Sequence, residues 1–378
     1  RVLFRSICLF YVAKYLGLRV LILRRTCIAG YMYIDEDFRP KKSNWKFTYK
    51  ELYNPLNTII EKENTFEKLK NLSFTKNQVK GQWPKDWIEK KQYFEIFLDF
   101  LRKLGLQNLI FFVRIFLYGP QNNVEGATIN TSQRTTLAGI NPLNRWSYFK
   151  LHNSYLRILK KQIKNYNKLK TSNIDLSKPY IYLALHYQPE ASTLPEGMIF
   201  SDQLLIARNL AEALPKDWKL VIKEHPRQMT YDLRAMHARN NIYYENFLKN
   251  NNVIFASTDL DQNLLIEKCK ITATVSGSVG WEGLLKLKPS ILFSENWHSR
   301  CNSSRYVSSK NEIEDAINNL SNKTKEEIKS DVCLFIKEIS GYLINAVFSK
   351  KHLQIFFKKS NQEKSLNNIT SAILQRLD

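Results

Sequence analysis

The chain of 378 residues is 44% hydrophobic and 12% aromatic, which is enough apolar material for more than one domain. Its 57 Lys and Arg residues against 35 Asp and Glu residues give a formal net charge of +22, which favours anionic partners such as acidic lipid headgroups, nucleic acid or a phosphorylated substrate. A dedicated nucleic-acid-binding protein is disfavoured, because no basic block is interleaved with aromatic residues and no zinc-finger motif occurs. The five cysteines form no C-x-x-C pair, so they indicate neither a zinc ribbon nor a disulfide framework and fit a reducing cytoplasm.

The N-terminal part is predicted to be the second half of an α/β unit. Residues 7–17 have the pattern of a helix closed by Gly17, and residues 19–23 have the pattern of a strand. Because such a domain begins with a strand, and because the chain starts with Arg1, we expect the natural protein to extend further upstream. The acidic residues 35–37 are interpreted as a solvated loop.

The middle of the chain is predicted to be largely helical. Residues 84–105 form an amphipathic pattern, and residues 146–170 form a long basic helix. No apolar run reaches the roughly 18 residues that are needed to span a bilayer. The aromatic run 109–119, which contains Arg114, fits a buried helix better than a helix in a membrane surface, since no basic cluster adjoins it.

Short apolar strands alternate with helices from Pro179 onward. This alternation predicts an α/β domain with a parallel sheet that is covered on both faces. The five predicted strands are residues 180–185, 219–226, 252–257, 271–276 and 289–293. Helices are predicted at residues 201–215 with Ser201 as N-cap, and at 260–270, 279–288, 312–320 and 331–348.

Polar motifs follow three of these strands, at the edge of the sheet where ligands bind. They are LHYQPEAST at 185–193, KEHP at 223–226 and SGSVGWEG at 276–283. Because ligands of open parallel sheets bind outside the carboxyl ends of the strands, we expect the three motifs to face one crevice.

The SGSVGWEG motif is a strand, a tight turn and a helix start. Gly277 and Gly280 allow close approach of the backbone, and Ser276 and Ser278 add hydroxyls to the free N–H groups of the helix N-terminus. This arrangement favours an anion site, with purely structural glycines as the alternative.

The other two motifs offer ionisable side chains. Lys223 and His225 lie beyond a strand that Pro226 stops, and the histidine is interpreted as a phosphate ligand or as a residue satisfied by a backbone carbonyl. Glu190 is the only carboxylate after the first strand of this region, and it suits either a base or nucleophile, or a capping residue of the loop.

Taken in order, these motifs resemble the capsule polysaccharide biosynthesis proteins, which include the Kdo transferases of capsule assembly. That family carries a Q-x-x-x-S segment with an acidic residue, an H-P dipeptide, an S-G-[ST]-x-G-x-E segment and a following G-K-P. Here the motifs read QPEAS at 188–192, HP at 225–226, SGSVGWE at 276–282 and LKP at 287–289, where Leu287 replaces the glycine. The resemblance covers residues 178–310 well and the N-terminal half loosely.

The resemblance implies a GT-B fold, in which two Rossmann-like domains face each other across a cleft. The C-terminal domain of such a fold holds most of the nucleotide. For this chain it implies a partial N-terminal acceptor domain with helical insertions at 1–172, a nucleotide-sugar domain at 173–329, and C-terminal helices with a polar tail at 330–378.

The resemblance also implies roles for individual residues around a CMP-activated sugar. No cofactor and no metal is expected, because the helix N-terminus and a histidine can neutralise the single CMP phosphate. Glu190, at the position where the Kdo transferases have aspartate, and His225 are the catalytic candidates. The nucleotide-binding candidates are Lys223 at the base, His225 and Pro226 at the phosphate and ribose, Ser276, Gly277 and Ser278 at the phosphate, and Glu282 at the ribose or helix start. The candidates for contact with the rest of the substrate are His186, Gln188 and Ser192.

We therefore predict a glycosyltransferase of bacterial capsule or surface polysaccharide biosynthesis. It would transfer a Kdo-like or other nonulosonic acid from a CMP-sugar to a glycan or glycolipid acceptor. We expect it in the cytoplasm, with peripheral contact to the anionic inner membrane and no nucleic-acid partner. Two alternatives stay open: the same fold with a UDP- or GDP-sugar, and a non-catalytic capsule assembly protein.

Overall fold

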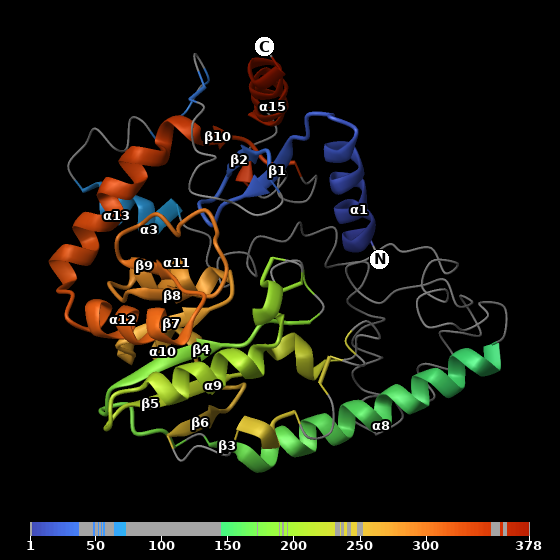
Figure 1. The fold of residues 1–378 in the computed structure, drawn as a ribbon, viewed down its shortest axis with the longest axis vertical. Helices are drawn as coiled ribbons and strands as arrows, with labels where there is room; N and C mark the ends of the chain where they lie inside the picture. Colours follow the sequence, from blue (N-terminus) through green and yellow to red (C-terminus); the bar gives the residue numbers. More distant parts are fainter. Residues whose placement is uncertain are drawn as a thin grey trace.

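A parallel sheet and a smaller antiparallel sheet organise the chain (Figure 1). The helices that the predictions place at 84–105 and 109–119 lie outside the described residues. The computed structural model describes residues 2–37, 48–49, 52, 54, 56, 64–72, 145–171, 173–188, 190, 193–194, 196–230, 235, 238–239, 243–247, 252–348, 356–357 and 361–377.

The larger sheet has seven parallel strands in the order β3-β6-β5-β4-β7-β8-β9. The predicted α/β class and all five predicted strands are confirmed, as β4 to β8. Two edge strands were missed, because two or three residues are too few for an apolar pattern. The bounds are β3 Lys170–Thr171, β4 Tyr180–Ala184, β5 Lys219–Lys223, β6 Val253–Ala256, β7 Ile271–Thr274, β8 Ser290–Leu292 and β9 Ser304–Tyr306.

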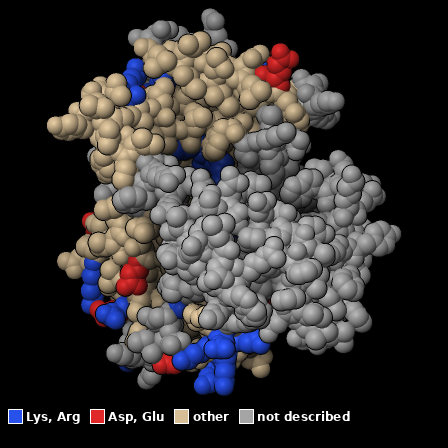
Figure 2. Space-filling model, turned by 90° about the vertical axis from the view of Figure 1, so that its right-hand side faces the viewer, with Lys and Arg blue, Asp and Glu red and all other residues tan. Residues whose placement is uncertain are grey.

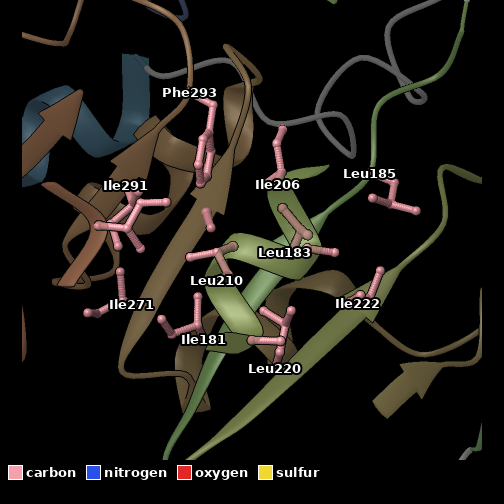
Figure 3. Close-up of a cluster of buried hydrophobic side chains, with 14 of the residues drawn as sticks. Ile181, Leu183, Leu185, Ile206, Leu210, Leu220, Ile222, Ile271, Ile291 and Phe293 are labelled. Carbon is pink, nitrogen blue, oxygen red and sulfur yellow. The ribbon is translucent and has the colours of Figure 1, made fainter. Parts of the chain in front are cut away.

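One face of this sheet is covered by α9 (Gln203–Ala213) and α12 (Lys310–Ser321). Successive side chains of a strand point to opposite faces, so Ile181 and Leu183 of β4 reach this layer together with Ile222 of β5. Figure 3 shows Ile206 and Leu210 of α9 over these strands. All of these side chains are buried, and at about 25 cal/mol per Å² their burial is a main contribution to the stability of the domain.

The other face is covered by α10 (Gln262–Lys268) and α11 (Ser278–Leu285), against which Tyr180 and Tyr182 of β4 pack. Helix α11 lies unusually close to β7 and β8. A Cβ on Gly280 would come within 2.8 Å of Ser290 Oγ, and one on Gly283 within 2.6 Å of Thr272 Oγ1. These two glycines therefore serve helix–strand packing.

The smaller sheet joins the two ends of the described chain. Its order is β1-β2-β10 and its pairs are antiparallel. The strand after α1 (Val2–Tyr15) thus pairs with an antiparallel neighbour, whereas an α/β unit would have given it a parallel one. Helix α15 (Gln362–Leu377) packs on this sheet and lies beside it at the top of Figure 1. The bounds are β1 Ile22–Arg25, β2 Tyr31–Asp35 and β10 Ile344–Asn345.

An ion-paired arginine connects the small sheet to the parallel sheet. Arg24 Nε on β1 lies 3.1 Å from Asp35 Oδ2 on β2, and its NH1 lies 3.3 Å from Glu196 Oε1 in the segment after β4. Asp35 is buried and not solvated, so the interpretation of residues 35–37 as a solvated loop is wrong for this residue. These ion pairs therefore tie the small sheet to the segment that follows β4.

Several helix ends differ from the predictions by a few residues. Asp202, not Ser201, caps α9, because its carboxylate accepts the N–H of Leu204 at 3.0 Å. The helix predicted to run to residue 348 ends at Ile339, after which the chain enters β10. Other helices are α3 Thr65–Leu72, α8 Arg145–Leu169, which confirms the predicted basic helix, α13 Lys325–Ile339, and the 3-10 turns η3 Met198–Ser201, η4 Pro226–Met229, η6 Glu245–Phe247 and η7 Ser340–Tyr342.

Within the described ranges, the helices are all too short or too polar to cross a bilayer.

A buried neutral histidine in this packing makes stability depend on pH. Asn296 Nδ2 donates to His298 Nε2 at 3.1 Å, so Nδ1 carries the proton and donates to Ser304 Oγ at 3.2 Å. Burial lowers the pKa of His298 from 6.5 to about 3.

We expect the free energy of unfolding to fall on acidification because of His298. Below pH 6.5 the unfolded chain binds a proton at this side chain that the folded chain does not bind until about pH 3. The loss should reach about 2 kcal/mol between pH 6.5 and pH 5. Urea unfolding at several pH values measures it, and His298→Gln should flatten this part of the profile. An identical pH dependence in the variant would contradict the assignment.

Candidate functional site

The strand order of the parallel sheet reverses between β4 and β7. The chain proceeds outward from β4 through β5 and β6 on one side, and from β7 through β8 and β9 on the other. Helices α9 and α11, which follow β4 and β7, lie on opposite faces of the sheet. Neither of these two helices covers the carboxyl ends of both strands, and ligands of such sheets bind at this place.

His186 and the turn at Gly277 meet at this point. His186 Nε2 lies 2.8 Å from Thr274 Oγ1 at the end of β7, and the ring is buried. The same Thr274 hydroxyl accepts the N–H of Gly277 at 3.2 Å. A Cβ on Gly277 would come within 3.0 Å of His186 Cε1, so the turn has space only for glycine. The hydrogen bond between His186 and Thr274 spans 88 positions of sequence. The structure thus brings together the motif that follows β4 and the turn that follows β7.

The N-terminus of α11 follows directly. Gly277 is the N-cap residue, and Ser276 and Ser278 on either side of it are half-buried. The first N–H groups of a helix carry a partial positive charge and lack partners within the helix. Chemically, this turn is suited to an anion such as a phosphate.

His225 lies at the end of the neighbouring strand β5. It is the N-cap residue of η4, and its Nδ1 accepts the N–H of Arg227 at 3.1 Å, with Pro226 as the first residue of the turn. The neutral ring therefore has its proton on Nε2. The partner of Nδ1 is thus a backbone N–H, whereas the structural alternative for this residue expected a backbone carbonyl. The Arg227 guanidinium lies 4.9 Å from the centre of the Tyr187 ring.

Two of the nucleotide-binding candidates are engaged inside the protein. Lys223 is buried at the end of β5, and its Nζ donates to the carbonyl oxygen of Leu260. Glu282 Oε2 accepts from Gln262 Nε2 on α10 at 2.8 Å, which directs the side chain toward α10. Its Oε1 is buried and has no hydrogen-bond partner within the described part of the chain.

Two further candidates follow β4: Gln188, predicted to contact the substrate, and Glu190, predicted to be catalytic. Gln188 Nε2 donates to the carbonyl of Ser201 at 2.7 Å, and its Oε1 accepts from Arg239. The carbonyl of half-buried Glu190 accepts N–H groups of Thr193 and Leu194, at 3.2 and 3.0 Å, so Glu190 opens a turn beside the strand end. Ser192 lies outside the described residues.

Sequence reasoning missed a fully buried ion pair beside these residues. Arg239 Nε lies 2.8 Å from Glu224 Oε2, and neither side chain is exposed to solvent. Burial acts to lower the pKa of Arg239, but the Glu224 carboxylate more than offsets it, so the pKa is raised. The one available signal was the position of Glu224 inside the KEHP motif, between two residues that had been singled out.

Lys and Arg side chains are visible at several places on one face of the molecule (Figure 2). Figure 2 shows Lys and Arg atoms set back below the mostly uncharged upper part of the surface. In the described ranges, no group of three or more His, Cys, Asp or Glu side chains is arranged to hold a metal ion.

Comparison with known proteins finds a family that resembles the segment containing the three strand-end motifs. Residues 144–302 match the model of a family described as "Capsule polysaccharide biosynthesis protein". These residues are therefore similar to the capsule polysaccharide biosynthesis proteins. The resemblance seen in the motifs is thereby confirmed, and the family segment contains β4, β5 and β7 with all three strand-end motifs. A search of curated protein sequences gives no match.

Solved structures of several enzymes show a weak similarity to part of this chain. The UDP-GlcNAc 2-epimerase from Methanocaldococcus jannaschii is 16% identical, with 52% of this chain and 47% of that chain covered and a TM-score of 0.31. The Thermosulfurimonas dismutans KpsC β-Kdo 2,7 transferase is 10% identical, with 60% and 62% covered and a TM-score of 0.30. The Thermosulfurimonas dismutans KpsC β-Kdo 2,4 transferase is 17% identical, with 48% of this chain and 55% of that chain covered and a TM-score of 0.28. The chain thus matches between 47% and 62% of the length of these proteins, and TM-scores this low carry no argument about activity.

Proposed function

We propose that the chain is a glycosyltransferase of capsule or surface polysaccharide biosynthesis that uses a CMP-activated Kdo-like or other nonulosonic acid. The observation that carries the proposal is the meeting of His186 with the Gly277 turn where the strand order reverses. Ligands of parallel α/β sheets bind at this place, and the turn leads into a helix N-terminus that suits a phosphate. The family assignment of residues 144–302 supports the polysaccharide context.

The proposed mechanism needs two functions from these residues. The phosphate of CMP gains negative charge as the sugar leaves, and the N–H groups at the start of α11, with His225 Nε2–H, would stabilise that charge. A carboxylate must assist at the sugar or acceptor, and Glu190 is our candidate because it opens the turn after β4. Neither role requires Lys223 or Gln188, whose side chains are held by internal partners.

A UDP- or GDP-sugar is the second candidate donor, because the site features described here recognise a phosphate and not a particular base. Titration calorimetry with CMP, UMP, UDP and GDP separates the two. Tightest binding of CMP supports the proposal, and tightest binding of a diphosphate overturns the CMP assignment. Nucleotide binding without transfer to any acceptor would instead indicate a non-catalytic assembly protein.

The first prediction concerns His225. His225→Ala should weaken CMP by about 1.5–3 kcal/mol, because a hydrogen bond to a charged phosphate is lost. Titration calorimetry measures the change. The control is Lys310→Ala, which removes an exposed ammonium that pairs with Glu212 at 3.2 Å. CMP affinity unchanged by the His225 substitution would refute its contact with the phosphate.

The second prediction concerns Glu190. Glu190→Gln keeps the shape of the side chain and removes its charge, so transfer should fall about 100-fold or more while CMP affinity stays within about 2-fold. Sugar transfer measured with the natural donor, and calorimetry on the same sample, give the two values. Glu212→Gln, on the exposed side of α9, is the control. Near-normal transfer would leave Glu190 as a loop residue.

We also propose peripheral contact with the anionic inner membrane, supported by the net charge of +22. The protein should float with vesicles that contain anionic lipid, and about 0.5 M salt should release it, since the Debye length is then below 10 Å. Neutral vesicles are the control. Equal binding to both kinds of vesicle would contradict an electrostatic contribution.

A further inference from the structure

The Arg239–Glu224 ion pair is completely satisfied from the arginine side. Arg239 Nε donates to Glu224 Oε2 at 2.8 Å, and NH2 donates to Glu224 Oε1 at 3.2 Å and to the carbonyl of His186 at 3.1 Å. NH1 donates to Gln188 Oε1 and, at 3.2 Å, to the carbonyl of Ala238. All five N–H donors of the guanidinium therefore have acceptors.

Glu224 is equally satisfied. Its Oε1 accepts the backbone N–H of His225 at 2.8 Å in addition to Arg239, and its Oε2 accepts the Tyr244 hydroxyl at 2.7 Å. The carboxylate thus has four hydrogen bonds, one for each lone-pair direction. The N–H of Glu224 itself donates to the Tyr166 hydroxyl at 3.1 Å.

The two ends of this ion pair hold the backbones of different functional motifs. Arg239 contacts the His186 carbonyl and the Gln188 side chain after β4, whereas Glu224 contacts the N–H of His225 after β5. His186 in turn reaches Thr274 and the Gly277 turn after β7. One ion pair therefore fixes the distance between neighbouring strand ends.

Stability alone does not account for this arrangement. Removing two charges from water costs several kcal/mol per ion, and apolar replacements of a buried ion pair are often as stable. A planar fork of five donors, however, can hold two acceptors on one loop and a carboxylate on another, which no apolar pair and no lysine can do.

We propose that Arg239 and Glu224 are positioning residues of the nucleotide site. They set the separation of the β4 and β5 strand ends so that His186 and His225 contact the same ligand. The inference rests on the proposed nucleotide-binding function, without depending on which nucleotide binds. It makes Arg239, in a part of the chain that carries none of the recognised motifs, necessary for affinity.

The test uses substitutions that keep both charges and change the length of the side chain or the number of its hydrogen-bond donors. Arg239→Lys retains a cation beside Glu224 but has three donors in place of five, and Glu224→Asp shortens the carboxylate by one methylene. The matched control is Arg300→Lys, in the partly exposed pair of Arg300 and Glu338 at 3.5 Å. Affinity for the tightest-binding member of the panel CMP, UMP, UDP and GDP is measured by calorimetry, well below the melting temperature of each variant.

The expected result is a loss of about 10- to 100-fold in nucleotide affinity for Arg239→Lys, comparable to the effect of a misplacement of about 1 Å. Arg300→Lys should bind like the unaltered protein. Should Arg239→Lys not fold, Glu224→Asp is judged by the same criterion.

A purely structural role predicts a different pattern, because it lowers the melting temperature and leaves the affinity of the folded protein unchanged. Unchanged affinity in the folded variants overturns the inference and leaves the proposed function intact. If the unaltered protein binds none of the nucleotides of the panel, the proposed function is overturned, and the inference with it.

Discussion

No helix can cover the carboxyl ends of both β4 and β7, because the helices that follow them lie on opposite faces of the sheet. This constraint comes from right-handed connections that proceed outward in two directions from the middle of the sheet. Backbone groups at the two strand ends must then find partners among loop residues or ligands. His186 and the Gly277 turn meet there for this reason, and the Arg24 ion pairs tie the small sheet to the segment after β4.

Close packing and complete hydrogen bonding fix the geometry at these strand ends. The glycines of α11 let the helix approach β7 and β8 until there is no space for a methyl group. Glu224 and Arg239 use every donor and acceptor they have. Buried groups that are all paired have few alternative arrangements, which keeps a site organised before its ligand arrives.

The sequence predicted the parts of the fold that have a strong local pattern. Strands β4 to β8 are apolar runs between turns, and the rule on strand ends predicts where a ligand would bind. The α13 boundary at Ile339 was missed because the apolar pattern continues to residue 348, whereas pairing of β10 with β2 takes those residues out of the helix. The burial of Asp35 was missed because its partner is on another strand. The Arg239–Glu224 pair depends on tertiary contact, which a single sequence does not contain.

The antiparallel sheet has a consequence for the order of folding. Arg376 on α15 donates to the carbonyl of Ile34 on β2 at 3.0 Å, across 342 positions of sequence, and β10 pairs with the same strand. Contacts between such distant segments form late, because closing a long loop is entropically costly. During synthesis β1 and β2 leave the ribosome long before β10 and α15 exist. The edge of β2 that pairs with β10 therefore stays unpaired while the parallel domain folds. An unpaired strand edge favours aggregation, so we expect chaperones to act at this stage of folding.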